Sequence, residues 1–91
     1  MIKSFKDRNT EAVFKRVRCA RFHQIERSAR RRLYLDSTSE LRELAVIPGN
    51  QLEALRRDRI GQYSIRINQQ WRTCFVWQKG NAYDVEIADY H

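Results

Sequence analysis

The sequence predicts an α+β domain in which helices from the first half of the chain pack on one face of an antiparallel sheet formed by the second half. Two observations predict this fold. Apolar residues recur at helical spacing as far as Leu44, and from residue 52 onward they alternate with period two. The 91 residues suffice for one domain, residues 1–91, and leave no room for a second. Hydrophobic residues make up 42% of the chain, which is enough to form a core.

The residue pattern of the first half of the chain predicts a short strand and three helices. The strand is expected at residues 2–5, and the first helix is expected to begin at Asn9 or Thr10, which are good N-caps. A second helix over residues 24–35 has apolar residues at i, i+4 and i+8. Its other side is basic and carries Arg27, Arg30 and Arg31. Ser37 and Glu40 have capping-box spacing for a short third helix.

The second half predicts an antiparallel meander. Strands are expected at residues 52–55, 63–67, 71–77 and 83–87. Turns are expected at residues 68–70 and 78–81. The third of these strands is apolar at most positions, which predicts a central place in the sheet. The last strand is expected to place Tyr83, Val85 and Ile87 on one face.

Positive charge is concentrated in the first half of the chain. The whole sequence has 18 Lys and Arg against 11 Asp and Glu, a net charge of +7. Residues 15–32 hold eight basic residues and one acidic residue, which is also +7. Such a field attracts polyanions and speeds their encounter. A solvated helix face is the alternative interpretation of the same run.

The apolar stretches, the N-terminus and the two cysteines indicate the cellular compartment and whether a metal or cofactor is expected. The longest uncharged apolar stretch, residues 44–48, is too short to cross a bilayer, and the charged N-terminus lacks the apolar run of a signal peptide. Cys19 and Cys74 lack metal-ligand spacing and are interpreted as reduced thiols. We therefore expect a cytoplasmic protein with no membrane association, no metal and no cofactor.

Two polar clusters interrupt the pattern of the second half. The first is a loop at residues 55–61, and its arginines are Arg56, Arg57 and Arg59. The second closes the sequence and consists of Asp89, Tyr90 and His91. Between them lies Arg72, on the opposite side of its strand from its sequence neighbours. Because strand ends lie side by side in a meander, we expect these groups to share one surface.

These side chains suit the cleavage of RNA without a metal. A base must take the proton of the ribose 2′-OH, cations must stabilise the phosphorane, and an acid must protonate the leaving 5′ oxygen. Histidine titrates near neutral pH, so His91 suits proton transfer, and Asp89 can serve as base or hold His91 in place. Arg56 and Arg72 can grip the phosphate, and Tyr90 can stack on a base or donate a proton. Taken alone, a terminal histidine and loop arginines are more often frayed, solvated surface residues.

Residues 55–72 carry a resemblance to a known family. They read LRRDRIGQYSIRINQQWR and are followed by TCFVW at residues 73–77. This run resembles the signature of the HigB-type toxins of the RelE/ParE superfamily, approximately L-K/S-G-D-R-x-G-Q-Y-S-I-R-I-N-x-Q-W/Y-R and then I/L-C-F-x-W. Residues 1–5 and 86–91 also resemble the ends of the family, so the similarity covers the whole chain and is most specific in its middle third.

The resemblance implies a fold like that of small microbial ribonucleases, ribosome-dependent cleavage of mRNA, and neutralisation by a HigA-like helix-turn-helix antitoxin. It places the catalytic groups at Arg56, Arg72, Asp89, Tyr90 and His91. We expect RNA or the ribosome to be bound by Arg57, Arg59, Arg66, Arg27, Arg30 and Arg31.

Two positions depart from the family pattern. Some members have a histidine three residues before the basic residue of the loop, where this chain has Glu53, which either acts as a base or has no role. The family's loop glycine is replaced by Arg57, which strengthens the attraction for phosphates and changes how closely the loop approaches the RNA backbone.

Two other function classes remain alternatives. A ParE-like toxin, from the same superfamily, poisons DNA gyrase by binding and has no ribonuclease chemistry. The terminal Asp-Tyr-His favours the ribonuclease, because the gyrase-binding branch does not need it. A basic binding module without enzymatic activity is the third interpretation.

Overall fold

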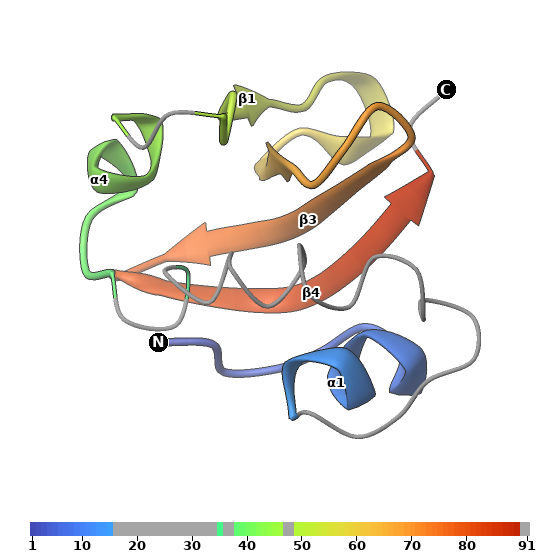
Figure 1. Cartoon of the computed structure of the whole chain (residues 1–91). Coiled ribbons are helices and arrows are strands. Elements are labelled where there is room, and N and C mark those ends of the chain that lie inside the picture. Colours follow the sequence, from blue (N-terminus) through green and yellow to red (C-terminus); the bar gives the residue numbers. More distant parts are fainter. Residues whose placement is uncertain (16–34, 36–37, 47–48, 90–91) are drawn as a thin grey trace.

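The computed structural model describes residues 1–15, 35, 38–46 and 49–89, which form an α+β fold (Figure 1). Four strands form one antiparallel sheet in the order β1-β2-β3-β4. Their bounds are Glu53–Ala54 for β1, Gln62–Arg66 for β2, Trp71–Gln78 for β3 and Asn81–Asp89 for β4. The helical elements that are described are α1 (Arg8–Phe14), α4 (Leu41–Ala45) and the 3-10 turn η3 (Arg57–Arg59). The predicted meander is confirmed, and β3 takes the predicted central place between β2 and β4.

Helix α1 begins earlier than the sequence predicted. Its N-cap is Asp7, whose Oδ1 accepts a hydrogen bond from the Thr10 N–H at 2.7 Å, so Asn9 and Thr10 lie inside the first turn. A carboxylate is a stronger acceptor than an amide or a hydroxyl, and the helix dipole favours it at this end. The Thr10 hydroxyl is buried instead and accepts from the Ile87 N–H at 2.9 Å, which ties α1 to β4.

Helix α4 also has a different cap from the one predicted. Glu40 is the N-cap, and its N–H donates to Oε1 of Glu43 at 3.1 Å, so the expected pairing of Ser37 with Glu40 is wrong by three residues. The carboxylate of Glu43 satisfies an N–H that the helix itself leaves without a partner. At the other end, the buried Asn50 donates from Nδ2 to the carbonyl oxygen of Leu44 at 3.2 Å.

The N-terminal segment lies along β4 but is not the strand that was predicted over residues 2–5. Its ladder pairing with β4 consists of two isolated parallel bridges, Ile2–Ala82 and Phe5–Val85. Between them, Asp84 has a left-handed φ of 51°, and the β3–β4 register shifts at this point. The bulge turns the backbone of β4 and prevents a continuous ladder.

The same bulge corrects the predicted face of the last strand. Tyr83 was expected to share a face with Val85 and Ile87, but Ala82 packs in the core with these two residues and Tyr83 does not. One extra residue in a strand reverses the alternation on one side of the bulge. The predicted turn at residues 78–81 is confirmed: Lys79 and Gly80 have φ of 51° and 78°, which suits a tight hairpin.

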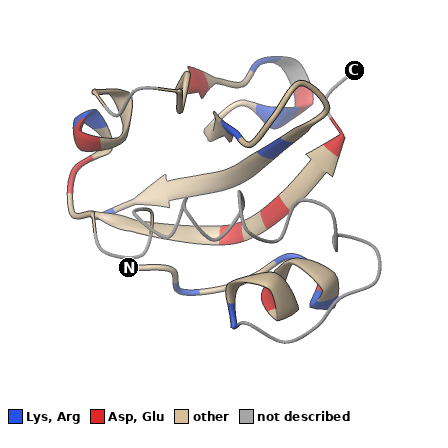
Figure 2. Ribbon diagram, in the orientation of Figure 1, with Lys and Arg blue, Asp and Glu red and all other residues tan. Residues whose placement is uncertain are grey.

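The sheet has one apolar and one polar face. The apolar face packs with the helices in a core that contains Val13, Phe14, Leu35, Leu44, Ile65, Ile67, Phe75, Ala82, Val85 and Ile87. By strand register, the other face carries Glu53, Ser64, Arg66, Arg72, Cys74 and Glu86. Figure 2 shows acidic residues along β4 and basic residues on β3 and in the segments around β2. Among the described residues, no helix has the length and hydropathy of a membrane span.

Leu35 is the one described residue of the helix predicted at 24–35, and it is buried in the core. The rest of that segment lies outside the described residues, together with Arg27, Arg30 and Arg31. The second helix therefore stays a prediction.

Thr73 offers a direct test of the core. Its side chain is fully buried, and Oγ1 has no hydrogen-bond partner among the described residues. An unsatisfied buried hydroxyl costs about 1–3 kcal/mol, and valine has nearly the same shape. We expect Thr73→Val to raise the free energy of unfolding by about 1 kcal/mol in denaturant titrations. A loss of stability would show that the hydroxyl is satisfied in solution.

Candidate functional site

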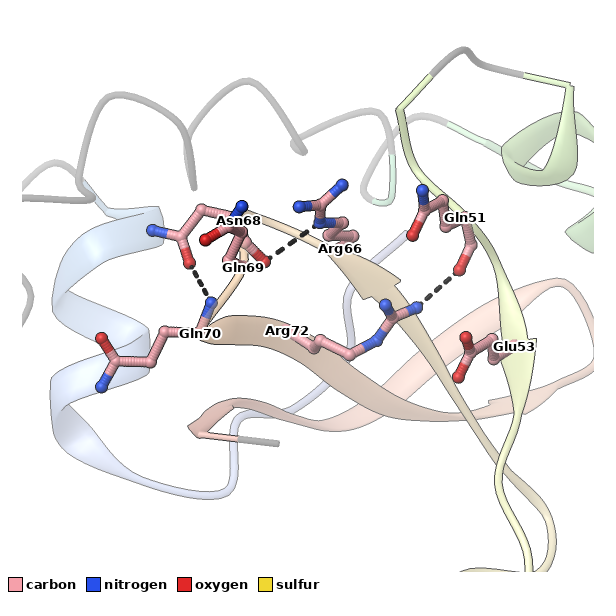
Figure 3. Close-up of a pocket in the computed structure, with 7 residues that line it drawn as sticks. All are labelled: Gln51, Glu53, Arg66, Asn68, Gln69, Gln70 and Arg72. Carbon is pink, nitrogen blue, oxygen red and sulfur yellow. Dashed lines mark hydrogen bonds between the residues drawn. The ribbon is translucent and has the colours of Figure 1, made fainter. Parts of the chain in front are cut away.

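A cavity of about 230 Å³ opens on the polar face, at the end of the sheet where β2 turns into β3 (Figure 3). The segment that enters β1, the paired ends of β2 and β3, and the turn between them supply its walls. The lining residues are Gln51, Glu53, Arg66, Asn68, Gln69, Gln70 and Arg72. Two guanidiniums, four amides and one carboxylate make this cavity suitable for an anionic ligand that also forms hydrogen bonds.

Arg72 is the most firmly held side chain of the cavity. It lies on the central strand and is only 7% exposed. Its Nε donates to Ser64 Oγ at 2.7 Å, and its Nη2 donates to the carbonyl oxygens of Gln51 and, at 3.3 Å, Ser64. These bonds fix the plane of the guanidinium before any ligand arrives, so binding an anion costs little further ordering.

Gln51 belongs to the site through its backbone, which sequence patterns do not reveal. Its φ of 45° lies in the left-handed region, where a residue other than glycine is uncommon. This conformation accompanies the hydrogen bond from Arg72 to the Gln51 carbonyl (Figure 3). The preceding residue holds the segment in place, because the Asn50 carbonyl accepts from the Arg66 N–H at 2.6 Å. Backbone strain of this kind clusters at functional sites.

Arg66 and Glu53 complete the charges of the cavity. Arg66 is paired in register with Arg72, so two cationic side chains stand on one face of adjacent strands. Like charges in directly opposed positions destabilise a sheet, and an anion bound between them would relieve the repulsion. Glu53 is paired in register with Ser64, which places its carboxylate on the same face at the cavity wall (Figure 3).

The β2–β3 turn connects the cavity with the end of β4. Asn68 holds the turn, because its Oδ1 accepts from the N–H groups of Gln70 at 2.9 Å and Trp71 at 2.8 Å. Gln70 in turn donates from Nε2 to Oδ2 of Asp89 at 3.1 Å. Asp89 is therefore tied to a residue of the cavity rim, as expected for a strand end in a meander.

Arg56 stands apart from this cavity. The Leu55 N–H donates to the Gln62 carbonyl at 2.9 Å, so the chain passes the first residue of β2 just before it reaches Arg56. Arg66 is the last residue of β2, and the cavity lies at that end. Arg56 is exposed at the opposite end of the strand. The structure thus brings Arg72 and Arg66 together in the cavity lining. Asp89 is linked to the rim through Gln70 but is paired in register with Trp71, on the opposite face of the sheet, and Arg56 is not in the lining.

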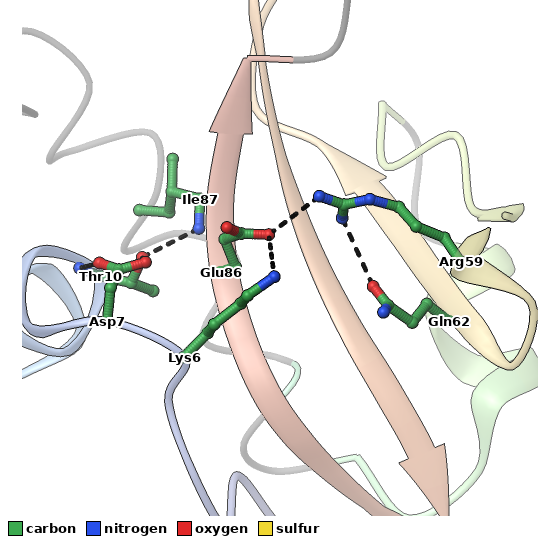
Figure 4. Close-up of polar contacts among 7 residues, drawn as sticks. All are labelled: Lys6, Asp7, Thr10, Arg59, Gln62, Glu86 and Ile87. Atoms are coloured by element: carbon green, nitrogen blue, oxygen red, sulfur yellow. Dashed lines mark hydrogen bonds and ion pairs between the residues drawn. The ribbon is translucent and has the colours of Figure 1, made fainter.

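The remaining predicted residues fall into two groups. Arg57 and Arg59 belong to η3, and Arg59 forms an ion pair with Glu86, with Nη2 and Oε1 3.3 Å apart (Figure 4). The other group lies outside the described residues and consists of Arg27, Arg30, Arg31, Tyr90 and His91.

Comparison with known sequences gives one consistent family. Residues 3–91 match the family described as the RelE-like toxin of the type II toxin–antitoxin system HigB. The chain is 31% identical over 93 residues to a Proteus vulgaris protein named Endoribonuclease HigB, and the alignment covers 100% of both chains. It is 34% identical over 85 residues to Toxin HigB-1 of Vibrio cholerae serotype O1, with 90% of each chain covered.

A solved structure supports the fold. The chain is similar to a chain in the crystal structure of the heterotetrameric YoeB–YefM toxin–antitoxin complex from Staphylococcus aureus, with a TM-score of 0.61. The match covers 100% of this chain and 98% of that chain at 19% sequence identity. At this identity the similarity establishes the shared fold alone.

Proposed function

This chain belongs to the RelE-like HigB family of toxins from type II toxin–antitoxin systems, and on this basis we propose that it is an endoribonuclease that cleaves mRNA on the ribosome. One observation carries the proposal: the buried Arg72 is oriented by oxygen acceptors at the wall of a polar cavity, beside a second arginine. A guanidinium held in this way suits an RNA phosphate. The relative named as an endoribonuclease supports this activity over gyrase poisoning.

The proposed reaction is an attack of the ribose 2′ oxygen on the adjacent phosphorus. A base takes the 2′-OH proton, the bond from the 2′ oxygen to phosphorus forms, and the bond from phosphorus to the 5′ oxygen breaks. An acid protonates the leaving oxygen, which gives a 2′,3′-cyclic phosphate and a 5′-hydroxyl. Arg72 and Arg66 stabilise the additional negative charge on the phosphorane. Arg56 attracts a phosphate further along the strand.

We assign proton transfer to His91, with Asp89 as its orienting partner and Tyr90 as a base-stacking or proton-donating group. Asp89 supports this assignment, because Gln70 of the cavity rim donates to it at 3.1 Å. Only one residue separates Asp89 from His91 in the sequence, which supports a shared role for the two side chains. Glu53, which lines the cavity, is the alternative base.

Docking on the ribosome explains how so small a site acts on mRNA. The cavity offers two guanidiniums and few acid–base groups, so we propose that ribosomal RNA positions both the toxin and its substrate. Basic residues outside the cavity suit contacts with ribosomal phosphates, and they include Arg57, Arg27, Arg30 and Arg31. The site of action is then the cytoplasm.

Primer extension on mRNA after induced expression tests this function. We expect new 5′ ends inside the coding region of a translated reporter message. The matched control is the same message without its start codon, which should stay intact because it does not enter the elongating ribosome. Equal cutting of both messages would contradict the requirement for the ribosome, and growth arrest without new ends would contradict ribonuclease activity.

The chain acts with an antitoxin, as a member of a toxin–antitoxin family. We propose a HigA-like helix-turn-helix protein whose acidic surface meets the basic segment at residues 15–32. We expect joint reversal of Arg27, Arg30 and Arg31 to glutamate to weaken the complex more than tenfold in calorimetry, while Arg72→Gln changes it little. The reverse result would show that the antitoxin covers the cavity directly.

A further inference from the structure

A second polar group lies on the polar face, toward the β4 edge of the sheet. Oε1 of Glu86 on β4 lies 3.3 Å from Nη2 of Arg59 and 3.7 Å from Nζ of Lys6 (Figure 4). Nη1 of Arg59 donates to Oε1 of Gln62 at 3.4 Å. One carboxylate thus joins three parts of the chain: the N-terminal segment, the 3-10 turn η3 and strand β4.

Arg59 crosses the sheet to make this contact. It lies just before β2, whereas Glu86 lies on β4, two strands away. Adjacent strands are about 4.8 Å apart, so the side chain has to lie back over β3 to reach Glu86. Both partners are partly shielded from water, with side chains 33% and 21% exposed. Shielding makes this ion pair stronger than a fully exposed one.

Cys74 marks the place where Arg59 crosses. It is paired in register with Glu86 on one side and Ser64 on the other, and it is only 1% exposed. Burial raises the pKa of the Cys74 thiol, and the nearby positive charge of Arg59 opposes this effect. The thiol is therefore buried on the face of β3 that lies next to Glu86, the ion-pair partner of Arg59.

The ion pair between Arg59 and Glu86 also fixes the position of the turn that carries Arg56. The Arg59 N–H donates to the carbonyl oxygen of Arg56 at 3.1 Å, so holding Arg59 holds the turn that carries Arg56. Ile60 on the same loop is 79% exposed, and Gly61 has a φ of 93° that turns the chain into β2. The loop is thus anchored on its inner side and open on its outer side.

We propose that Glu86 is a positioning residue that anchors the arginine loop, residues 56–60, and that Arg59 serves as the anchor and does not itself contact RNA. The inference rests on the proposed function, because the anchored loop holds Arg56 ready for a phosphate of the RNA substrate. Preorganisation of this kind lowers the ordering cost of binding. Glu86 then acts on substrate affinity and leaves Arg72 and the chemical step unchanged.

The direction in which RNA affinity changes in Glu86→Gln separates the anchoring role from a general effect of charge. Glu86→Gln removes a negative charge from a protein that binds a polyanion, so electrostatics alone predicts tighter binding. Loss of the anchor predicts weaker binding instead. The matched control is Asp84→Asn on the same strand, which removes the same charge away from the loop, and asparagine tolerates the left-handed φ of 51° at this position.

The test uses full-length protein with mRNA bound to ribosomes, and a fluorescent 2′-O-methyl RNA oligonucleotide as an uncleavable probe. We expect Glu86→Gln to raise KM and the Kd for the probe by three- to tenfold while kcat changes less than twofold. Asp84→Asn should match the wild type or bind slightly more tightly. Tighter binding by both variants would overturn the proposal.

A double variant with the two charges exchanged keeps the proposal testable if a single variant misfolds. Arg59→Glu combined with Glu86→Arg keeps the net charge and rebuilds the ion pair in reverse, so we expect it to restore most of the binding that Arg59→Glu loses. If Arg59 contacts RNA directly, the exchange will not restore binding, and the anchor role is wrong.

Thiol labelling reports on the anchor without any ribonuclease activity. In a Cys19→Ser background, Cys74 should react with a maleimide at least tenfold faster in Glu86→Gln than in Asp84→Asn. Equal rates would show that the contact does not hold the loop over the sheet. If the wild type does not cleave mRNA but labelling follows this expectation, the anchor stands and the proposed function fails.

Discussion

Arg72→Gln is expected to lower the rate of mRNA cleavage on the ribosome by about a hundredfold to a thousandfold. Loss of one preorganised group that stabilises the charge of a transition state costs about 2.7–4 kcal/mol in comparable sites. Glutamine still reaches toward Ser64 but has no positive charge and no fork of parallel donors. The effect should fall on kcat, because Arg66 stays in place to attract the phosphate. Single-turnover cleavage of ribosome-bound mRNA measures it.

Two controls separate this loss of catalysis from a loss of fold. Arg72 is 7% exposed, so thermal melting of each variant must accompany the rates. Arg42→Gln removes an arginine from α4 whose side chain is 83% exposed, and it should cut at the wild-type rate. Arg72→Lys keeps the charge but not the fork, so we expect it to fall between the two. A fully active Arg72→Gln would show that the cavity is not the site.

His91→Ala is expected to lower the same rate by about a hundredfold to ten-thousandfold, the range for loss of a general acid or base. Replacing the side chain leaves Asp89 and its bond to Gln70 intact, so the fold and the affinity for RNA should hold. Glu53→Gln is the matched comparison, because Glu53 lines the cavity and is the alternative base. We expect this variant to keep cleavage within about tenfold of the wild type.

The two variants together decide which residue transfers protons. If His91→Ala cuts normally and Glu53→Gln does not cut, Glu53 is the base and the assignment to the C-terminus is wrong. If neither change matters while Arg72→Gln is inactive, the cavity binds the phosphate and the acid–base groups lie elsewhere.

The meander was predictable because its signals are local. Period-two alternation, the polar turn at residues 68–70 and the apolar run of β3 each point to the same arrangement, and the structure confirms it. The error at Tyr83 has one cause: the bulge at Asp84 adds a residue to β4, and no feature of the alternating pattern marks it. The cap of α1 was misplaced because Asp7, Asn9 and Thr10 are all acceptable caps.

The candidate site was only partly predictable, for a physical reason. Side-chain type indicates chemistry, so Arg72 and Asp89 could be proposed from sequence. The Gln51 carbonyl could not, because it acts through a backbone conformation that is unusual for glutamine. For Arg59 the charge predicts RNA binding, which stays a prediction, and the sequence does not show its ion pair with Glu86, because the two residues are 27 positions apart and meet only in the folded sheet.

Cleavage of ribosome-bound mRNA with a single 2′-deoxyribose at the cut position tests the central claim most directly. The purified chain is added to ribosomes carrying either the unmodified message or the substituted one, and the ends of the products are analysed. We predict that the unmodified message yields a 2′,3′-cyclic phosphate and a 5′-hydroxyl, and that the substituted message stays intact at that bond because the attacking oxygen is missing. Cleavage of the substituted message at the same bond would contradict attack by the 2′ oxygen and with it the proposed mechanism.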